Sequence, residues 1–320
     1  MLATTLLLAA IAIDAATDGA TDGDWVTRLG GTATRGPQGE IIGLELRGTW
    51  VADADLRSIA SLASLKSLDL SHTLITDIGF QTLKSAPAIE ELNLYYAEQV
   101  GDGVATVIKG WKKLKKLNMR GTKITDLGVA QLAGHPALEW IDVGYSLFTD
   151  NGFDPLVSIP RLKHAAVGGN QLTDVGLNSL RLVPGLESLD ASGAQRTDSG
   201  MWFASITDRG METIALLPKL QNVNLRGSKI SDVGAAQFAK LAVLTRLDLG
   251  QTNLTMRGLE SLPKQLQWLS LWKCTKVDDT AVEALSQLTK LTWLDLEGTQ
   301  ISPTGEARLR AALPNCRVKR

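Results

Sequence analysis

Apolar and polar residues alternate along this chain in a unit that changes from strand spacing to helix spacing within about two dozen residues. The unit is clearest in LKKLNMRGTKITDLGVAQLAGHPA, residues Leu114–Ala137, where Leu114, Leu117 and Met119 follow the spacing LxxLxL. Successive side chains of a strand point to opposite faces, so Leu117 and Met119 are predicted to share one side of a short strand.

The second half of the unit, ITDLGVAQLAG, has the spacing of a short helix. Its apolar residues Ile124, Val129 and Leu132 are placed to pack against the same core as the strand. We expect Thr125 to cap the helix, because its hydroxyl can accept a free backbone N–H, and Asp126 to favour the positive end of the helix.

A single unit of this kind cannot bury its apolar side, so it must stack on copies of itself. The predicted strand centres are Leu44, Leu68, Leu92, Leu117, Ile141, Ala165, Leu189, Val223, Leu247, Leu269, Leu294 and Val318. The steps between them are 24 or 25 residues, except for 34 before Val223 and 22 before Leu269. The pattern predicts a solenoid.

The combination of LxxLxLxxT/N with ITDxGL resembles the leucine-rich-repeat family. The similarity is greatest to bacterial members and to ribonuclease-inhibitor-like or F-box-receptor-arm repeats, and it covers roughly Ile41 to Val318. The resemblance implies an α/β horseshoe of about eleven repeats, with a parallel sheet on the concave side and short helices on the convex side. It implies recognition through a surface, and the scaffold does not name the partner.

Composition narrows the possibilities. With 320 residues in a continuous array, one elongated domain is expected, and the net charge of −1 gives no reason to expect nucleic acid or an anionic membrane as partner. Cys274 and Cys316 lie almost two repeats apart, roughly 10 Å across the strands, which is too far for an undistorted disulfide. We expect both to be structural thiols.

The N-terminal segment has the pattern of an export signal. Residues 1–16 contain an apolar run that is too short to span a bilayer and ends in small residues, with Ala10-Ile11-Ala12 as a candidate cleavage site. The run lacks a preceding Lys or Arg, so a disordered or loosely helical cytoplasmic terminus is the alternative. We expect export to the periplasm or outside the cell, without membrane insertion after processing, and a flexible linker over residues 17–24.

An open solenoid end exposes core residues and requires a cap. Residues 25–40 are assigned to that cap: an apolar helical turn from Trp25 to Leu29, then the first strand of a hairpin whose turn is residues 36–39. The repeat domain then covers residues 41–320.

The largest irregularity is the 34-residue step, RTDSGMWFASITDRGM, in which the TDxG signal occurs twice. Asp198 and Asp208 are each predicted to begin a helical turn. Trp202 and Phe203 lie between them and either tuck under a neighbouring helix or protrude toward a partner.

No catalytic or metal-binding constellation is found. The histidines His72, His135 and His164 fall on different repeats, and no nucleophile, phosphate-loop or zinc motif occurs in a suitable context. The aspartates that follow Thr or Ser recur with the repeat, which indicates a structural role at helix starts. They lack the charged oxygen cage that calcium requires. We expect neither enzymatic activity nor a cofactor.

Two features of the exposed strand faces are open to a functional reading. A polar column lies after the strand centres: Asp69, Asn93, Asn118, Asp142, Asp190, Asn224, Asp248 and Asp295. It either keeps an exposed sheet soluble or offers hydrogen bonds to an extended ligand. The basic run of residues 109–123 is either a solvated face or an attraction for an acidic partner.

Aromatic and arginine residues also occupy the exposed strand positions, where stacking does not require them. The candidate binding residues are Trp268, Trp272, Trp293 and Arg246 near the C-terminal end, and Tyr95, Tyr96, Trp140, Tyr145 and His164 nearer the middle. Trp, Tyr and Arg dominate binding hot spots. The C-terminal cluster could instead reflect mutual packing of the indoles or a dimer contact.

These observations favour a non-enzymatic interaction module that binds a protein or peptide on its concave face. Trp268, Trp272 and Trp293 are the first candidate anchors. The alternative is a carbohydrate-binding surface, in which exposed Trp and Tyr rings stack on sugars and the polar column binds hydroxyls.

Overall fold

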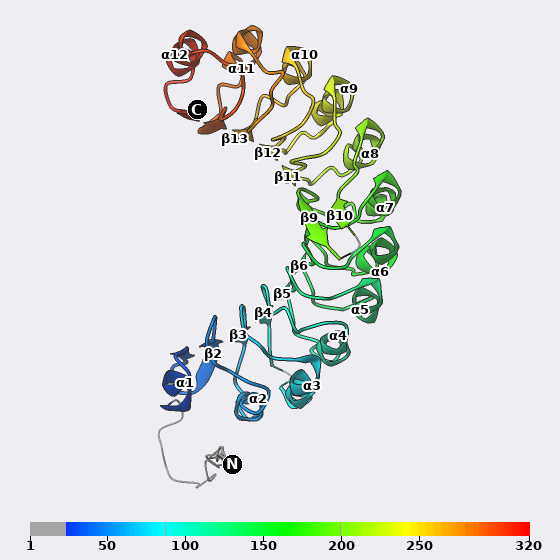
Figure 1. Cartoon of the computed structure of the whole chain (residues 1–320), viewed down its shortest axis with the longest axis vertical. Helices are drawn as coiled ribbons and strands as arrows, with labels where there is room; N and C mark the ends of the chain where they lie inside the picture. The colour runs from blue at the N-terminus through cyan, green and yellow to red at the C-terminus, as the bar shows by residue number, and fades with distance from the viewer. Residues whose placement is uncertain (1–23, 87, 199) are drawn as a thin grey trace, which may run out of the picture.

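The computed structural model describes residues 24–86, 88–198 and 200–320, and it is an open horseshoe (Figure 1). The strands line the inner, concave side, and the short helices form the outer, convex side. The predicted signal peptide and most of the predicted linker lie outside the described residues. The α/β leucine-rich-repeat solenoid predicted from the repeat is confirmed.

The main sheet follows the chain order β1-β2-β3-β4-β5-β6-β7-β8-β11-β12-β13-β14-β15. Its strands are β1 (Thr32–Arg35), β2 (Ile41–Glu45), β3 (Ser67–Asp69), β4 (Glu91–Asn93), β5 (Lys116–Asn118), β6 (Trp140–Asp142), β7 (His164–Ala166), β8 (Ser188–Asp190), β11 (Asn222–Asn224), β12 (Arg246–Asp248), β13 (Trp268–Ser270), β14 (Trp293–Asp295) and β15 (Arg317–Lys319). A separate pair is formed by β9 (Ala194–Thr197) and β10 (Gly200–Phe203).

The helices are α1 (Asp24–Arg28), α2 (Leu56–Ala60), α3 (Asp77–Phe80), α4 (Gly103–Ile108), α5 (Asp126–Gln131), α6 (Phe153–Val157), α7 (Asp174–Asn178), α8 (Asp208–Ile214), α9 (Asp232–Ala235), α10 (Met256–Glu260), α11 (Val282–Ser286) and α12 (Pro303–Ala312). Short 3-10 turns extend or precede several of them, at 81–85, 150–152, 179–182, 236–240 and 279–281.

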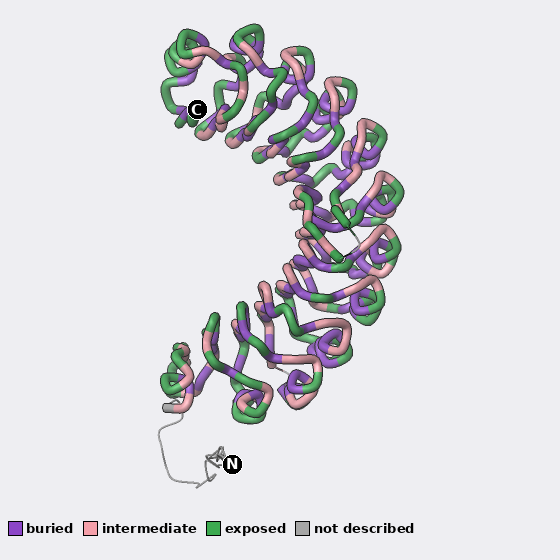
Figure 2. Tube along the Cα trace, in the orientation of Figure 1, coloured by how far each residue is buried: buried purple, intermediate pink, exposed green. Residues whose placement is uncertain are grey.

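All the predicted strand centres pair in register from β2 to β15. Leu44 lies opposite Leu68, Val223 opposite Leu189, and Leu294 opposite Val318. The centres are almost fully buried, and so are the apolar residues of the facing helices, so one continuous core runs between the two layers (Figure 2). Nearest-neighbour stacking therefore buries what a single repeat leaves exposed.

The ITDxG segment connects each repeat to the next. Thr125 caps α5 as predicted, because its hydroxyl accepts the Leu127 N–H at 3.1 Å. The same Thr125 donates its N–H and its hydroxyl to the carboxylate of Asp102, one repeat earlier, both at 2.7 Å. The aspartate therefore links repeats, a role beyond the helix-start electrostatics expected from sequence.

This link recurs along the convex side. Its pairs are Asp53 with Thr76, Asp102 with Thr125, Asp126 with Thr149, Asp150 with Thr173, Asp174 with Thr207, Asp208 with Ser231, Asp232 with Thr255 and Asp279 with Ser302. The glycine of the segment makes room for it: a β-carbon on Gly128 would lie 2.4 Å from the Asp102 carboxylate. We call this series the Asp–Thr ladder.

The ladder is interrupted twice within the described repeats after Asp53. At the first interruption, Asp77 faces Gly101 instead of Thr or Ser, and its carboxylate accepts only the backbone N–H groups of Gly101 and Gly103, at 2.8 and 3.1 Å. The second interruption lies between α10 and the repeat that follows it. Met256 occupies the aspartate position of α10, and the facing residue is Asp278, whose carboxylate accepts from Thr280 in its own repeat. The joint between these two repeats therefore relies on packing and on the strand pairing of β12 with β13.

The N-terminal hairpin forms as predicted. Strand β1 pairs antiparallel with β2, and α1 closes with Gly30 at φ 83°. Val26 is 1% exposed and joins the core, so residues 24–35 cover the open end of the sheet. Their role as a cap remains a prediction.

The 34-residue step contains one of the two helix starts expected there. Asp208 begins α8, but Asp198 lies in the turn of the β9–β10 hairpin, so the helix predicted at Asp198 is wrong. The ladder explains the difference: Asp174 accepts the N–H and hydroxyl of Thr207, and Thr197 extends β9 instead. The single aspartate of the preceding repeat, Asp174, is thus bound by Thr207 of the second TDxG segment.

The two cysteines are free and buried, as expected. The Cys274 thiol donates to the Leu249 carbonyl at 3.1 Å, and burial raises its pKa. Burial also raises the pKa of Cys316. Both thiols are therefore kept protonated and act as small core residues.

Candidate functional site

Three rows of side chains on the concave side contain the candidate residues. Row A is the residue just before each strand centre, row B lies three residues after the centre, and row C lies four residues after it. The larger side chains of row A include Lys116, Trp140, His164, Arg246, Trp268, Trp293 and Arg317. Those of row B include Arg47, Tyr95, Arg120, Arg226, Trp272 and Glu297. Those of row C are His72, Tyr96, Tyr145, Gln251 and Lys273, and glycines occupy the other row C positions.

In row A, four consecutive strands carry the order Arg246, Trp268, Trp293, Arg317, each directly opposite the next. The Arg246 guanidinium lies over the Trp268 ring at 3.6 Å, and the Arg317 guanidinium over the Trp293 ring at 5.0 Å. Both indoles are half-buried. A planar guanidinium stacks well on an indole face, so each ring is held by the neighbouring strand.

Trp272 in row B is covered by two cations. The Arg226 guanidinium lies 3.5 Å from its ring centroid, and the Lys273 ammonium lies 4.3 Å from it. Hydrogen bonds from Lys319 and from the Trp272 indole lower the pKa of Glu297, which also pairs with Lys319 at 2.6 Å. Glu297 is therefore charged and forms its ion pair with Lys319.

The three C-terminal indoles contact cationic side chains and do not pack on one another. Among the described residues, the ring-to-ring contacts lie elsewhere, for instance between Phe80 and Trp111 in the core, and each of the three indoles is covered by Arg or Lys. The Trp293 indole N–H is buried without a hydrogen-bond partner in the described chain.

The cluster predicted near the middle is divided into separate groups. Tyr95 and Tyr96 contact each other, with ring centroids 4.7 Å apart, and both contact His72 at 5.2 and 5.8 Å. Burial is the main reason that the pKa of Tyr96 is raised. Trp140 lies apart from them, under Lys116 at 5.5 Å and opposite His164 in register.

Every described row C residue from Gly48 to Gly298 has a positive φ. This backbone conformation suits glycine, yet His72, Tyr96 and Tyr145 adopt it at φ 54°, 51° and 50°. The His72 ring stacks on Tyr96, whereas the two tyrosine rings lie over glycines of the next repeats. A β-carbon on Gly121 would be 2.8 Å from the Tyr96 ring, and one on Gly169 would be 2.7 Å from the Tyr145 ring. From Tyr96 to Gly169, aromatic and glycine residues thus alternate along this row.

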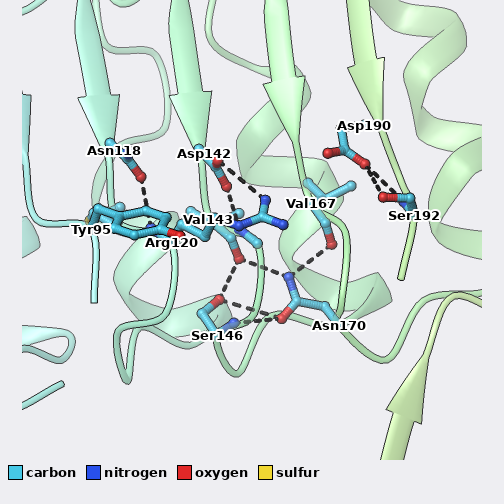
Figure 3. Close-up of polar contacts among 12 residues, drawn as sticks. Tyr95, Asn118, Arg120, Asp142, Val143, Ser146, Val167, Asn170, Asp190 and Ser192 are labelled. Carbon is cyan, nitrogen blue, oxygen red and sulfur yellow. Dashed lines mark hydrogen bonds and ion pairs between the residues drawn. The ribbon is translucent and has the colours of Figure 1, made fainter. Parts of the chain in front are cut away.

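Arg120 and Asp142, labelled in Figure 3, form a polar group that contacts Tyr145. The Arg120 guanidinium lies over the Tyr145 ring at 4.5 Å and contacts the Asp142 carboxylate at 3.4 Å. Burial raises the pKa of Asp142, while Arg120 opposes this effect. Burial would lower the pKa of Arg120, but Asp142 and Asp190 raise it, so the guanidinium remains charged.

The neighbouring turns are fixed by Asn170, which is fully buried. Its amide donates to the Val143 carbonyl at 2.8 Å and to the Val167 carbonyl at 2.9 Å, and its oxygen accepts the Ser146 N–H at 3.0 Å. This network, drawn in Figure 3, fixes the turn from Val143 to Ser146, which contains the row C residue Tyr145.

The β9–β10 hairpin lies beside this group. The Gln195 amide donates to the Ser146 carbonyl at 2.5 Å, 49 residues earlier in the chain. Met201 is 58% exposed and Phe203 43%, with Lys229 over the Phe203 ring at 5.5 Å, while Trp202 is half-buried. The hairpin therefore exposes part of its apolar surface next to the concave edge.

Sequence reasoning missed three partners of the candidate residues: His72, Lys116 and Arg317. His72 occupies the same row C position as Tyr96, and Lys116 and Arg317 occupy the same row A position as Trp140 and Trp293. Comparison of equivalent positions in adjacent repeats would have identified them.

No group of three or more potential metal ligands occurs among the described residues. Within the same ranges, no helix has the length and apolar character needed to cross a bilayer.

The repeat motif and the fold are similar to those of known proteins. The family described as Leucine Rich repeat matches residues 61–84 and 112–133. The fold is similar to that of an internalin from Listeria monocytogenes, with 23% identity, a TM-score of 0.62, and 83% of this chain and 70% of that chain covered. A leucine-rich-repeat protein of Leptospira interrogans is similar with 19% identity, a TM-score of 0.42, and 82% and 80% covered. None of the curated protein sequences compared with the chain matches it.

The fold and the repeat motif define a solenoid with an extended concave surface. The chain has the leucine-rich-repeat solenoid fold, and the model of the Leucine Rich repeat family matches two of its segments. Proteins of this class are generally interaction modules that bind other proteins.

Proposed function

We propose that this protein binds a protein or peptide on its concave face, with Trp268, Trp272 and Trp293 as anchors. The observation that carries the proposal is the register of Trp268 with Trp293 on adjacent strands, each stacked with an arginine and half-exposed. Rigid, stacked aromatic side chains lose little conformational freedom on binding, as in other hot spots. Tyr95, Tyr96, Trp140, Tyr145 and His164 form a second contact region in this proposal.

The position of the β9–β10 hairpin also favours binding at the concave face. Its exposed Met201 and Phe203 lie next to the concave edge through the contact of Gln195 with Ser146. In the proposal, a partner on the central repeats also contacts Trp202 and Phe203.

The carbohydrate alternative is less well supported. A sugar ring stacks on an open indole face, but Arg226 and Lys273 already lie over Trp272, and Arg246 lies over Trp268. Peptide side chains and carboxylates can instead use the indole edges and the guanidinium N–H groups.

The test is affinity capture with the full chain, comparing wild type with the Trp268→Ala/Trp272→Ala variant. Trp50→Ala is the matched control, because Trp50 is 89% exposed outside the three rows. We expect specific protein partners that the double variant loses and the control retains. If Trp50→Ala loses the partner and the double variant retains it, the binding site does not lie on the concave face. If wild type binds soluble glycans and the double variant does not, the carbohydrate alternative is favoured.

We further propose that the chain acts without catalysis and after export to the periplasm or cell exterior. The support for export is the apolar run of residues 2–13 with its small-residue site. Mass spectrometry of the protein recovered from its source would read the N-terminus. An intact Met1 in cytoplasmic extract would contradict export.

A further inference from the structure

The C-terminal part of the concave face has cations without ion-pair partners. Among the described residues, Arg226, Arg246, Lys273 and Arg317 form no ion pair with a carboxylate, whereas Lys319 pairs with Asp295 and Glu297. Nearer the middle of the face, Lys115 pairs with Glu90 and Arg120 with Asp142. Four cations without an ion pair to a described carboxylate therefore surround Trp268, Trp272 and Trp293.

Nearby carboxylates do not neutralise these cations by direct contact. Asp248 lies on the strand of Arg246, but its carboxylate accepts the Gly250 N–H at 2.9 Å. Burial raises the pKa of Asp248, against the opposing effects of that hydrogen bond and of Arg226 and Arg246. The guanidinium groups thus keep free N–H donors.

A guanidinium that stacks on an indole presents its N–H groups at its edge. That edge matches a carboxylate, which can accept two parallel hydrogen bonds. Arg246 and Arg317 lie on β12 and β15, three strand spacings apart, which is about 14 Å at ~4.8 Å per strand. Four residues of extended peptide span about the same distance at ~3.4 Å per residue.

We infer that this surface binds an extended acidic peptide that crosses β12 to β15. Two carboxylates four residues apart pair with Arg246 and Arg317, and apolar side chains between them contact Trp268 and Trp293. This inference rests on the proposed function and specifies the chemistry of its partner.

The probe is a fluorescent, end-blocked heptapeptide with two glutamates four residues apart and three apolar residues between them. Its twin carries glutamine in place of both glutamates. Binding of each to the full chain is measured by fluorescence anisotropy at low salt and at about 0.3 M salt, where exposed charge pairs are screened. We expect the acidic peptide to bind on the order of tenfold more tightly at low salt, with the difference shrinking at high salt.

The variant Arg246→Gln/Arg317→Gln should bind the two peptides equally. The control Arg47→Gln, an exposed row B arginine on the first repeat, should keep the preference. Trp268→Ala/Trp293→Ala should weaken binding of both peptides, because it removes the apolar contacts common to them.

Each other outcome overturns the inference. Equal affinity of wild type for the two peptides removes the acidic requirement but leaves peptide binding on this face in place. Absence of binding by either peptide rejects the inference, and partner capture then decides the proposed function separately. Tighter binding of a sulfated oligosaccharide, lost in Arg246→Gln/Arg317→Gln, identifies an anionic glycan instead.

Discussion

Arg226 and Trp272 stack with a distance of 3.5 Å between the guanidinium carbon and the ring centroid, although their strands, β11 and β13, are not neighbours. Gly250 occupies the row B position on the strand between them. A β-carbon there would lie 3.0 Å from the Trp272 carbonyl oxygen and 3.3 Å from its β-carbon. Because Gly250 has no side chain, the Arg226 side chain can cross β12 and reach Trp272.

A double-mutant cycle should detect this contact. We expect Arg226→Ala and Trp272→Ala to be coupled by about 0.5–1 kcal/mol in the free energy of unfolding, and by up to about 2 kcal/mol if the pair is well desolvated. Urea unfolding measures all four proteins. A cycle of Arg226→Ala with Trp293→Ala, which do not stack, is the control, and equal coupling in both cycles would contradict the contact.

The Asp–Thr ladder should contribute to the stability of each joint. Replacing Asp126 with Ala leaves the N–H and hydroxyl of Thr149 without their acceptor, so we expect a loss of about 1–3 kcal/mol in the free energy of unfolding. Urea denaturation gives the value. The companion variant Asp154→Ala removes an exposed aspartate that binds one serine hydroxyl, and should change stability far less.

At the joint where Met256 and Asp278 interrupt the ladder, the missing link can be added. Met256→Asp combined with Asp278→Thr places an acceptor and a donor at the two ladder positions, and should stabilise the repeats that follow β12. Hydrogen exchange of the amides in β13–β15 should slow. Met256→Asp alone places a new carboxylate opposite that of Asp278 and should lower the free energy of unfolding. A higher free energy of unfolding in this single variant would contradict the role assigned to the Asp–Thr ladder.

His135 should make stability depend on pH. Its ring is 3% exposed, its Nε2 lies 3.1 Å from the Trp111 carbonyl oxygen, and burial lowers its pKa. The unfolded chain therefore takes up a proton more readily, so stability is retained above about pH 6.5 and lost as the pH falls below that value. Urea midpoints between about pH 7.5 and about pH 5.5 test this. His135→Gln should make the urea midpoint depend less on pH. If the pH dependence is unchanged in this variant, other groups cause it.

Row C can be tested with a matched pair of glycines. Gly169→Ala adds a β-carbon 2.7 Å from the Tyr145 ring at φ 76°, whereas Gly134→Ala meets nothing within 4 Å at φ 67°. The control should show the left-handed backbone penalty of about 1 kcal/mol, and Gly169→Ala about 1–3 kcal/mol more because the ring must move. Equal losses in thermal or urea unfolding would mean that the ring does not rest on Gly169.

The sequence was sufficient for the regular part of the fold. Periodicity located every strand centre from Leu44 to Val318, and Thr125 identified the helix cap, because these depend on local spacing and capping. The acceptor role of Asp102 and the failure of Asp198 to begin a helix depend on a partner one repeat away. Local patterns do not contain that information.

The same limit applies to the candidate site. Strand alternation put Trp268 and Trp293 on the exposed face, but it did not indicate that Arg246 and Arg317 cover them. Side-chain direction across neighbouring strands decides which residues meet. Reading equivalent positions of adjacent repeats together recovers most of these pairs.

The placement of Tyr96 over Gly121, and of Tyr145 over Gly169, has a consequence for recombination of this gene segment. Exchange of a single repeat would bring an aromatic ring against a residue with a β-carbon, or leave a glycine uncovered. Exchange of two consecutive repeats would preserve the fit. Between Tyr96 and Gly169, the unit that can be exchanged without disturbing this fit is therefore a pair of repeats, twice the length of the structural one.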